Sequence, residues 1–240
     1  MTRTTTGLLA ALLATTLLAG PALGQEAAIR KNLGERLPQI GKIDEVSKTP
    51  MAGLFEVRVG TDLYYTDADG SYLIHGQLID VKGRRNLTEE RTSKLTAIDF
   101  GQLPVKDSFA IVRGNGKRQL AVFEDPNCGY CKRFERELQK LENVTIHLFL
   151  YPILGNDSVD KSRNIWCAKD RAKAWQDWML REQAAAPAAA GCDATALDRN
   201  RELGRKHQIT GTPTLVFADG TRVPGAINAA QVEKMLSQAQ

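Results

Sequence analysis

The sequence is poor in cysteine and histidine, and no hydrophobic run in it is long. Its 240 residues include four cysteines and three histidines, and the apolar run at 7–19 spans about thirteen residues. A helix that crosses a bilayer needs about 20 apolar residues, so this run is too short to cross one comfortably. His75, His147 and His207 are isolated, and we interpret each as a strand or surface residue rather than a metal ligand or a base.

Charge of one sign is not in large excess either. The chain carries 32 Lys and Arg against 28 Asp and Glu, a formal net charge of +4, and it contains no repeats. The densest basic patch, Lys82-Gly83-Arg84-Arg85, is interpreted as a solvated linker. Nucleic acid is therefore not among the expected partners.

The N-terminus has the three parts of a secretory signal peptide. Arg3 makes the start positive, the apolar run follows, and Ala22 and Gly24 put small residues at the −3 and −1 positions of a cleavage site. We predict a signal peptide at 1–24 that is cleaved before Gln25. An uncleaved anchor is the less favoured alternative, because no stop-transfer stretch follows. The exported chain would keep a net charge of about +3 and would enter a space where disulfides persist.

The segment after the signal peptide predicts a small domain at 25–81. Residues 26–37 have helical spacing, with apolar residues four apart and a proline directly after them. Asp69-Gly70 is a good hairpin turn between two short strand-like segments. We predict one helix on a small antiparallel sheet, with strands at 40–46, 54–59, 63–66, 72–75 and 78–81.

So small a domain buries little apolar surface, leaves sheet edges open and has no cysteine to staple it. We therefore predict association through an edge strand or the apolar face, with a monomer as the alternative. Residues 82–104 are the predicted linker. Its centre, 87–100, is a mostly polar helix with acids in its first turn, which is typical of a solvent-exposed bridge between domains.

The remaining segment, 105–240, predicts a second domain. We expect strands at 109–112, 119–123 and 144–151, a helical insertion at about 157–207, a hairpin at 214–218 and 222–226, and a final helix capped by Asn228. A β-α-β unit, a helical insertion and then ββα is the order of a thioredoxin-like fold. The predicted fold class is therefore α+β.

The motif Cys-Gly-Tyr-Cys at 128–131 follows a short apolar strand and a turn, and it opens a helix whose apolar stripe is Phe134, Leu138 and Leu141. A thiol at a helix N-terminus lies among unpaired backbone N–H groups at the positive end of the helix dipole, so its pKa falls. The second cysteine lies one turn away on the same side, close enough to form a disulfide. The motif predicts an exchangeable dithiol and leaves open whether it oxidises, reduces or isomerises.

Other chemistries fit the four cysteines less well. Zinc would need two more ligands, normally a second closely spaced pair, and Cys167 and Cys192 do not supply one. Covalent haem attachment would need His where the chain has Lys132. A merely structural disulfide would leave the lowered pKa at the helix start unused. We therefore expect no metal and no cofactor.

Four stretches together resemble a known family. They are the motif at 128–131, Gly211-Thr212-Pro213-Thr214, Ile165-Trp166-Cys167-Ala168-Lys169-Asp170 and Val223-Pro224-Gly225. The chain resembles the thioredoxin superfamily and, within it, the DsbC/DsbG family of periplasmic protein-disulfide isomerases. The likeness covers nearly the whole mature chain in layout and is most specific over 119–227. DsbG proteins usually have Pro where this chain has Gly129, so the dipeptide favours the DsbC branch.

The resemblance implies an overall architecture and a set of partners. A cystatin-like N-terminal domain would form the homodimer, linker helices would hold two thioredoxin-like domains apart, and an uncharged cleft would hold substrate. The implied substrates are misfolded, disulfide-containing exported proteins, bound in a chaperone-like manner. A membrane reductase of the DsbD type would keep the dithiol reduced in the periplasm.

The resemblance also implies roles for individual residues. Cys128, at an exposed helix terminus, would attack substrate disulfides, and the more buried Cys131 would resolve the mixed disulfide. Gly129 and Tyr130 would shape the helix start and bind substrate. Thr212 and Pro213, joined by a cis peptide bond in the family, would bind substrate beside the dithiol. Four cysteines allow three pairings, and the family has a structural disulfide that corresponds to Cys167 and Cys192.

Several functions remain as alternatives. One is a DsbG-like specialised reductase and chaperone, and another is a dedicated reductant of one partner protein. A monomeric oxidase is disfavoured by the predicted extra domain and linker. A binding module that acts without its thiols is a fourth.

Overall fold

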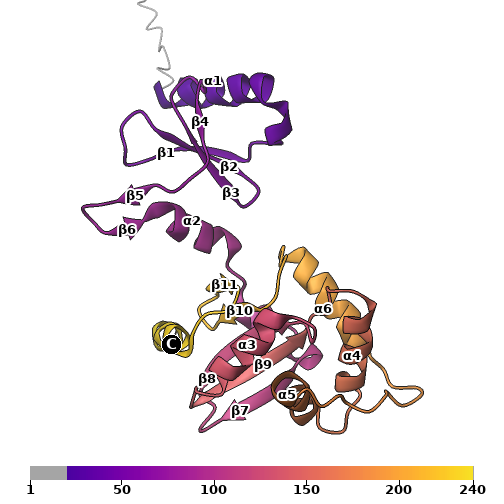
Figure 1. Ribbon diagram of the computed structural model, residues 1–240. Helices are drawn as coiled ribbons and strands as arrows, with labels where there is room; N and C mark the ends of the chain where they lie inside the picture. Colours follow the sequence, from indigo (N-terminus) through magenta and orange to yellow (C-terminus); the bar gives the residue numbers. More distant parts are fainter. Residues whose placement is uncertain (1–20, 240) are drawn as a thin grey trace, which may run out of the picture. The chain divides into compact units, whose positions relative to one another are not determined.

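The computed structural model describes residues 21–239, so the predicted signal peptide lies almost entirely outside the described residues. The chain divides into two compact units, Met1–Thr88 and Glu89–Gln240 (Figure 1). Each unit has its own sheet and its own hydrophobic core. No helix within the described residues is long and apolar enough to cross a membrane.

The first unit packs one helix on a four-stranded antiparallel sheet, as predicted. Helix α1 (Pro21–Arg36) buries Ile29 and Leu33 against the sheet. The strands are β1 (Glu45–Lys48), β2 (Phe55–Val59), β3 (Asp62–Thr66) and β4 (Leu73–Ile74), in that spatial order. Gly70 closes the β3–β4 hairpin with φ +61°, and a Cβ there would lie 3.4 Å from the Ile29 carbonyl oxygen. Glycine suits this position because it adopts a positive φ without strain and because it has no Cβ to crowd α1.

Two predictions for this unit were wrong in detail. The strand expected at 40–46 begins only at Glu45, because a 3₁₀ turn occupies Pro38–Ile40 and Gly41 follows with φ +88°. The strand expected at 78–81 is β5 (Ile79–Asp80), which pairs with β6 (Arg85–Asn86) in a separate two-stranded hairpin. The basic patch that was expected in a linker therefore occupies a hairpin turn, in which Arg84 has φ +53°.

The predicted linker helix is present but shorter than expected. Helix α2 (Leu87–Thr96) has no buried residue, whereas Ile98 and Leu103 directly after it are buried in a core cluster of the second unit. The Ile98 N–H donates to the Gly220 carbonyl oxygen at 3.0 Å. Residues after 96 leave the helix because burying these apolar side chains stabilises the chain more than about one further exposed helical turn would.

The second unit is built on a five-stranded sheet in the order β11-β10-β8-β9-β7. Its strands are β7 (Phe109–Arg113), β8 (Arg118–Glu124), β9 (Val144–Leu150), β10 (Thr214–Phe217) and β11 (Arg222–Pro224). Strands β8 and β9 are parallel and are connected by α3 (Gly129–Leu138); the other neighbours are antiparallel. This arrangement places the chain between β8 and α3 at the end of the central strand.

Alternate residues of β8 enter two separate cores, since successive strand side chains point to opposite faces. Leu120 and Val122 pack in the larger core with Phe134 of α3, whereas Ala121 and Phe123 pack in the smaller one. The larger core also receives side chains of α5 (Arg171–Arg181) and α7 (Ala229–Gln238). As predicted, Asn228 caps α7, in a capping box with Gln231.

The helical insertion contains α4 (Asn156–Trp166), α5 and α6 (Thr195–Lys206). The helical stripe predicted to run from Cys167 through Met179 is split, because Cys167 ends α4 and the Asp170 side chain caps α5. Cys167 and Cys192 are joined by a disulfide with their Cα atoms 6.1 Å apart.

Candidate active site

The dithiol follows the buried end of β8, and Asp125 holds the turn between them. The Asp125 side chain is completely buried and accepts four hydrogen bonds of 2.8–3.0 Å. Its donors are the backbone N–H groups of Asn127, Ile153 and Leu154 and the hydroxyl of Ser158. This carboxylate therefore ties the turn before Cys128 to the loop after β9 and to the start of α4. Sequence reasoning missed it, because three of its four donors lie about 30 residues away.

Cys128 is the N-cap residue of α3, where its sulfur accepts the Cys131 N–H at 3.2 Å. The same sulfur lies 3.2 Å from the Thr212 carbonyl oxygen. A hydrogen bond from the Cys131 side chain, with help from the Thr212 side chain and backbone N–H groups, outweighs burial and lowers the pKa of Cys128 to about 6. The expected exposed position was wrong: only 5% of Cys128 is accessible, because the loop that carries Thr212 lies against it.

Cys131 lies one helical turn further in and has no accessible surface. Burial raises the pKa of Cys131 well above that of an ordinary thiol, and the neighbouring Cys128 and Glu124 side chains raise it further. Both thiols are free in this structure. The two thiols, three residues apart in the sequence, therefore differ sharply in pKa. Cys128 ionises readily, whereas Cys131 stays protonated.

Two buried carboxyl groups lie behind Cys131. Glu124 ends β8 with no accessible surface, and Glu135 of α3 is 1% exposed. Trp175 Nε1 donates to Glu135 Oε1 at 2.6 Å, whereas both Glu124 oxygens lack a hydrogen-bond partner in the described part of the chain. Burial raises the pKa of both groups, and the Glu135 charge raises the pKa of Glu124 further. Each group is thus disposed to hold a proton beside the Cys131 thiol.

Sequence reasoning missed this pair, although a signal was present. Glu124 continues the alternation of Leu120 and Val122 that points into the larger core, and Glu135 is one helical turn after Cys131. A polar residue at a predicted core position is the pattern that could have revealed it.

The other predicted site residues meet at the same end of β8. The Thr212–Pro213 peptide bond is cis, and the Gly225 N–H donates to the Pro213 carbonyl oxygen at 2.8 Å. Gly129 is exposed, and a Cβ added there would meet nothing within 4 Å. Tyr130 is 63% exposed. The Cys167–Cys192 disulfide joins residues of the helical insertion instead.

A tryptophan with two lysines lies on another side of the dithiol. Trp178 Nε1 donates to the Pro126 carbonyl oxygen at 2.6 Å, and the ammonium groups of Lys132 and Lys161 lie 4.7 and 4.6 Å from its ring centroid. Lys132 also pairs with Glu182, and Lys161 pairs with Asp157. These lysines already have acidic partners.

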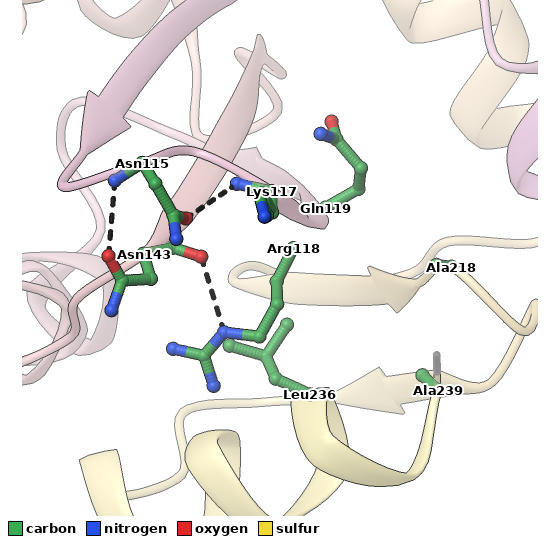
Figure 2. Close-up of a pocket in the computed structure, with 8 residues that line it drawn as sticks. All are labelled: Asn115, Lys117, Arg118, Gln119, Asn143, Ala218, Leu236 and Ala239. Atoms are coloured by element: carbon green, nitrogen blue, oxygen red, sulfur yellow. Dashed lines mark hydrogen bonds between the residues drawn. The ribbon is translucent and has the colours of Figure 1, made fainter.

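No metal cluster accompanies the dithiol in the part of the chain that the structure describes. Within residues 21–239, the His, Cys, Asp and Glu side chains form no group of three or more that could hold a metal ion. Figure 2 shows a pocket of about 460 Å³ whose lining includes Lys117, Arg118 and Leu236. It lies where β8 begins, at the opposite end of that strand from Cys128.

Comparison with known proteins identifies the family. A family described as "Disulfide bond isomerase protein N-terminal domain" matches residues 20–89, and a "Thioredoxin-like domain" family matches 105–240. The chain is 45% identical over 212 residues to the probable thiol:disulfide interchange protein DsbC of Bordetella pertussis, covering 88% of this chain and 74% of that protein. The chain belongs to the DsbC family.

More distant relatives agree with this assignment. The thiol:disulfide interchange protein DsbC of Escherichia coli K12 is 29% identical over 229 residues, covering 92% of this chain and 91% of that protein. The crystal structure of a disulfide interchange protein from Neisseria gonorrhoeae has a TM-score of 0.52 and 38% identity, covering 57% of this chain and 99% of that one. The predicted resemblance and the α+β fold are thus confirmed, and this member of the DsbC family is a thiol:disulfide interchange enzyme.

Proposed function

We propose that this DsbC-family protein is a protein-disulfide isomerase in which Cys128 is the nucleophile and Cys131 the resolving thiol. The observation that supports this most directly is the inequality of the two thiols. With a pKa of about 6, about nine-tenths of Cys128 is thiolate at pH 7. Cys131 is buried and stays protonated, so it does not compete for the substrate.

Isomerisation needs only the first thiol. The Cys128 thiolate attacks one sulfur of a wrong substrate disulfide, forming a mixed disulfide and releasing a substrate thiolate. That thiolate attacks another disulfide of the substrate, and a final substrate thiolate displaces Cys128. Each step breaks one S–S bond and forms one, so the enzyme returns as a thiolate without net oxidation. The low pKa of Cys128 makes it a good leaving group in the last step.

Cys131 completes a different outcome when rearrangement stalls. It loses its proton, attacks the Cys128 sulfur and releases the substrate as a thiol, leaving the enzyme oxidised and the substrate reduced by two electrons. Glu124 and Glu135 are the polar side chains placed beside this thiol. Their raised pKa values make an ionised carboxylate of the pair a stronger base, and the ionised one of the two would receive the proton. Return to the dithiol requires an outside reductant, for which we propose a membrane reductase of the DsbD type.

Substrate binding is proposed at the surface around the cis peptide bond. Thr212 lies against the Cys128 sulfur, Pro213 follows it, and Tyr130 and Gly129 are exposed at the helix start. We expect an extended substrate segment to pair with backbone groups of this loop while its cysteine reaches Cys128. Chaperone-like retention of misfolded, disulfide-containing proteins would use the same surface.

We propose a homodimer formed by the first unit. Its sheet ends at the short edge strand β4, where Tyr72 and Ile74 are 76% and 53% exposed, and Ile79 and Val81 follow at 54% and 82%. Exposed apolar side chains next to an open sheet edge favour pairing with a second copy.

We assign 25–81 to this dimerisation domain, 82–104 to the linker and 105–240 to the catalytic domain. We also propose that the signal peptide is cleaved before Gln25 and that the mature protein lies in the periplasm.

Refolding of a scrambled multi-disulfide protein by the full chain tests the function. Wild-type protein should restore the native disulfides, Cys128→Ser should be inactive, and Cys131→Ser should accumulate mixed disulfides. Isomerase activity that survives in Cys128→Ser would show that the nucleophile is assigned wrongly. A protein that fails to rescue the scrambled substrate but reduces one partner would instead be a DsbG-like or dedicated reductase, the alternative that its free dithiol also allows.

A further inference from the structure

A groove with unpaired positive charge lies along α3, the helix that carries Cys131. It has a volume of about 510 Å³ and is lined by residues of α3 and of the segment 226–228 that joins β11 to α7. Tyr130, the residue before Cys131, is part of the lining, so one end of the groove adjoins the reactive thiols. Arg133 and Arg136 lie further along the same helix, and both are exposed.

Arg133 is positioned but not neutralised. Its guanidinium carbon lies 4.3 Å from the centroid of the Tyr130 ring. Stacking of this kind uses the flat face of the guanidinium group and leaves the N–H donors at its edge available for a carboxylate. Among residues 21–239, the Arg133 side chain has no hydrogen bond or ion pair, and the same holds for the Arg136 side chain.

The acidic residue of the groove does not cancel these charges. Glu137 Oε1 lies 2.6 Å from Lys140 Nζ, and Oε2 accepts the Ala229 N–H at 3.0 Å. Its charge is therefore already compensated. By contrast, the lysines near Trp178 have acidic partners of their own, so the available positive charge around the dithiol is concentrated in this groove.

We propose that this groove binds the stretch of substrate polypeptide next to the cysteine under attack and selects stretches that carry an Asp or Glu side chain. The inference rests on the proposed function, since it assumes that Cys128 attacks polypeptide disulfides. It also departs from the uncharged cleft that the family resemblance implies. The two guanidinium groups are the part of the surface that would recognise a carboxylate, with Tyr130 and Ile227 contacting the peptide chain.

Rates of mixed-disulfide formation test the selection. The probes are short peptides with one cysteine held as a disulfide with thionitrobenzoate, and with Asp, Asn or Lys two positions before or after that cysteine. The Cys128 thiolate attacks the peptide sulfur and releases one coloured thionitrobenzoate anion, which stopped-flow absorbance follows. On one side of the cysteine, Asp should react about three- to tenfold faster than Asn, as two exposed ion pairs allow. The ratio should fall as salt is added.

Two double variants show whether the selectivity for Asp comes from the groove or from the net positive charge of the protein. Arg133→Gln with Arg136→Gln should bring the Asp-to-Asn ratio to about one. Lys117→Gln with Lys234→Gln removes the same charge outside the groove, and it should keep the wild-type ratio. If the double arginine variant does not fold, Arg136→Gln alone should still reduce the ratio.

The failures of the inference and of the proposed function are distinguishable. A wild-type ratio of about one at low salt, with rapid release from all peptides, overturns the groove and leaves Cys128 as the nucleophile. A ratio that survives in the arginine variants but falls in the lysine variant also overturns it, because the selection would then come from the net charge. Absence of release from every peptide overturns the proposed function itself.

Discussion

The lowered pKa of Cys128 can be traced to one neighbour, and Cys131→Ala removes it. A pKa of about 6, against an ordinary value of 9.0, corresponds to about 4 kcal/mol of preferential stabilisation of the thiolate. Its largest cause is the hydrogen bond from the Cys131 side chain. A hydrogen bond to a charged group contributes about 1.5–3 kcal/mol. The pKa of Cys128 in Cys131→Ala should therefore rise to about 7–8.

The assay is the pH dependence of alkylation by iodoacetamide, checked by the ultraviolet absorbance of the thiolate. At pH 7 the thiolate fraction should fall from about nine-tenths to between about one-half and one-tenth. Cys131→Ser is the matched control, because its hydroxyl can still donate, and its pKa should stay near the wild-type value. A pKa that remains about 6 in Cys131→Ala would refute this reasoning and assign the effect to the backbone N–H groups at the start of α3.

Four other predictions concern stability, measured as the free energy of unfolding in denaturant. A thiol whose pKa is lowered by folding stabilises the native state above its unfolded pKa and loses this effect as pH falls through the folded pKa. The stability of the reduced protein relative to the oxidised one should therefore rise by about 1.4 kcal/mol from pH 5 to pH 7; a flat difference would contradict it. For Glu124 the sign is opposite, since its raised pKa lowers stability as pH rises, so Glu124→Gln should gain stability relative to wild type toward high pH. Asp125→Ala leaves several donors without an acceptor and should cost about 2–4 kcal/mol, and Asp125→Asn should cost less. Replacing Cys167 and Cys192 together by Ser opens a loop of 25 residues and should cost about 3–4 kcal/mol; an unchanged free energy of unfolding would contradict it.

Predictions that depended on neighbouring residues agree with the structure. The hairpin about Asp219-Gly220, the Asn228 cap and the helix that begins after Cys128 all follow from contacts between residues at most ten apart. Errors occurred where an element ends. The linker helix stops at Thr96, because Ile98 is buried in the smaller core of the second unit. The residues near Ile98 in the sequence do not indicate this burial.

The amino-acid sequence by itself determined that a thiol pair lies at a strand-to-helix junction, that a thioredoxin-like order surrounds it, and that the chain belongs near the DsbC family. Local spacing and turn residues carry that information. Only the tertiary structure decided the environment of the pair. The Thr212 loop that covers Cys128 comes from 84 residues away, and Trp175, which binds Glu135, comes from 40 residues away. The Cys131 hydrogen bond that lowers the pKa of Cys128 is local, but the burial of both thiols and the contact with Thr212 arise only when distant segments fold together.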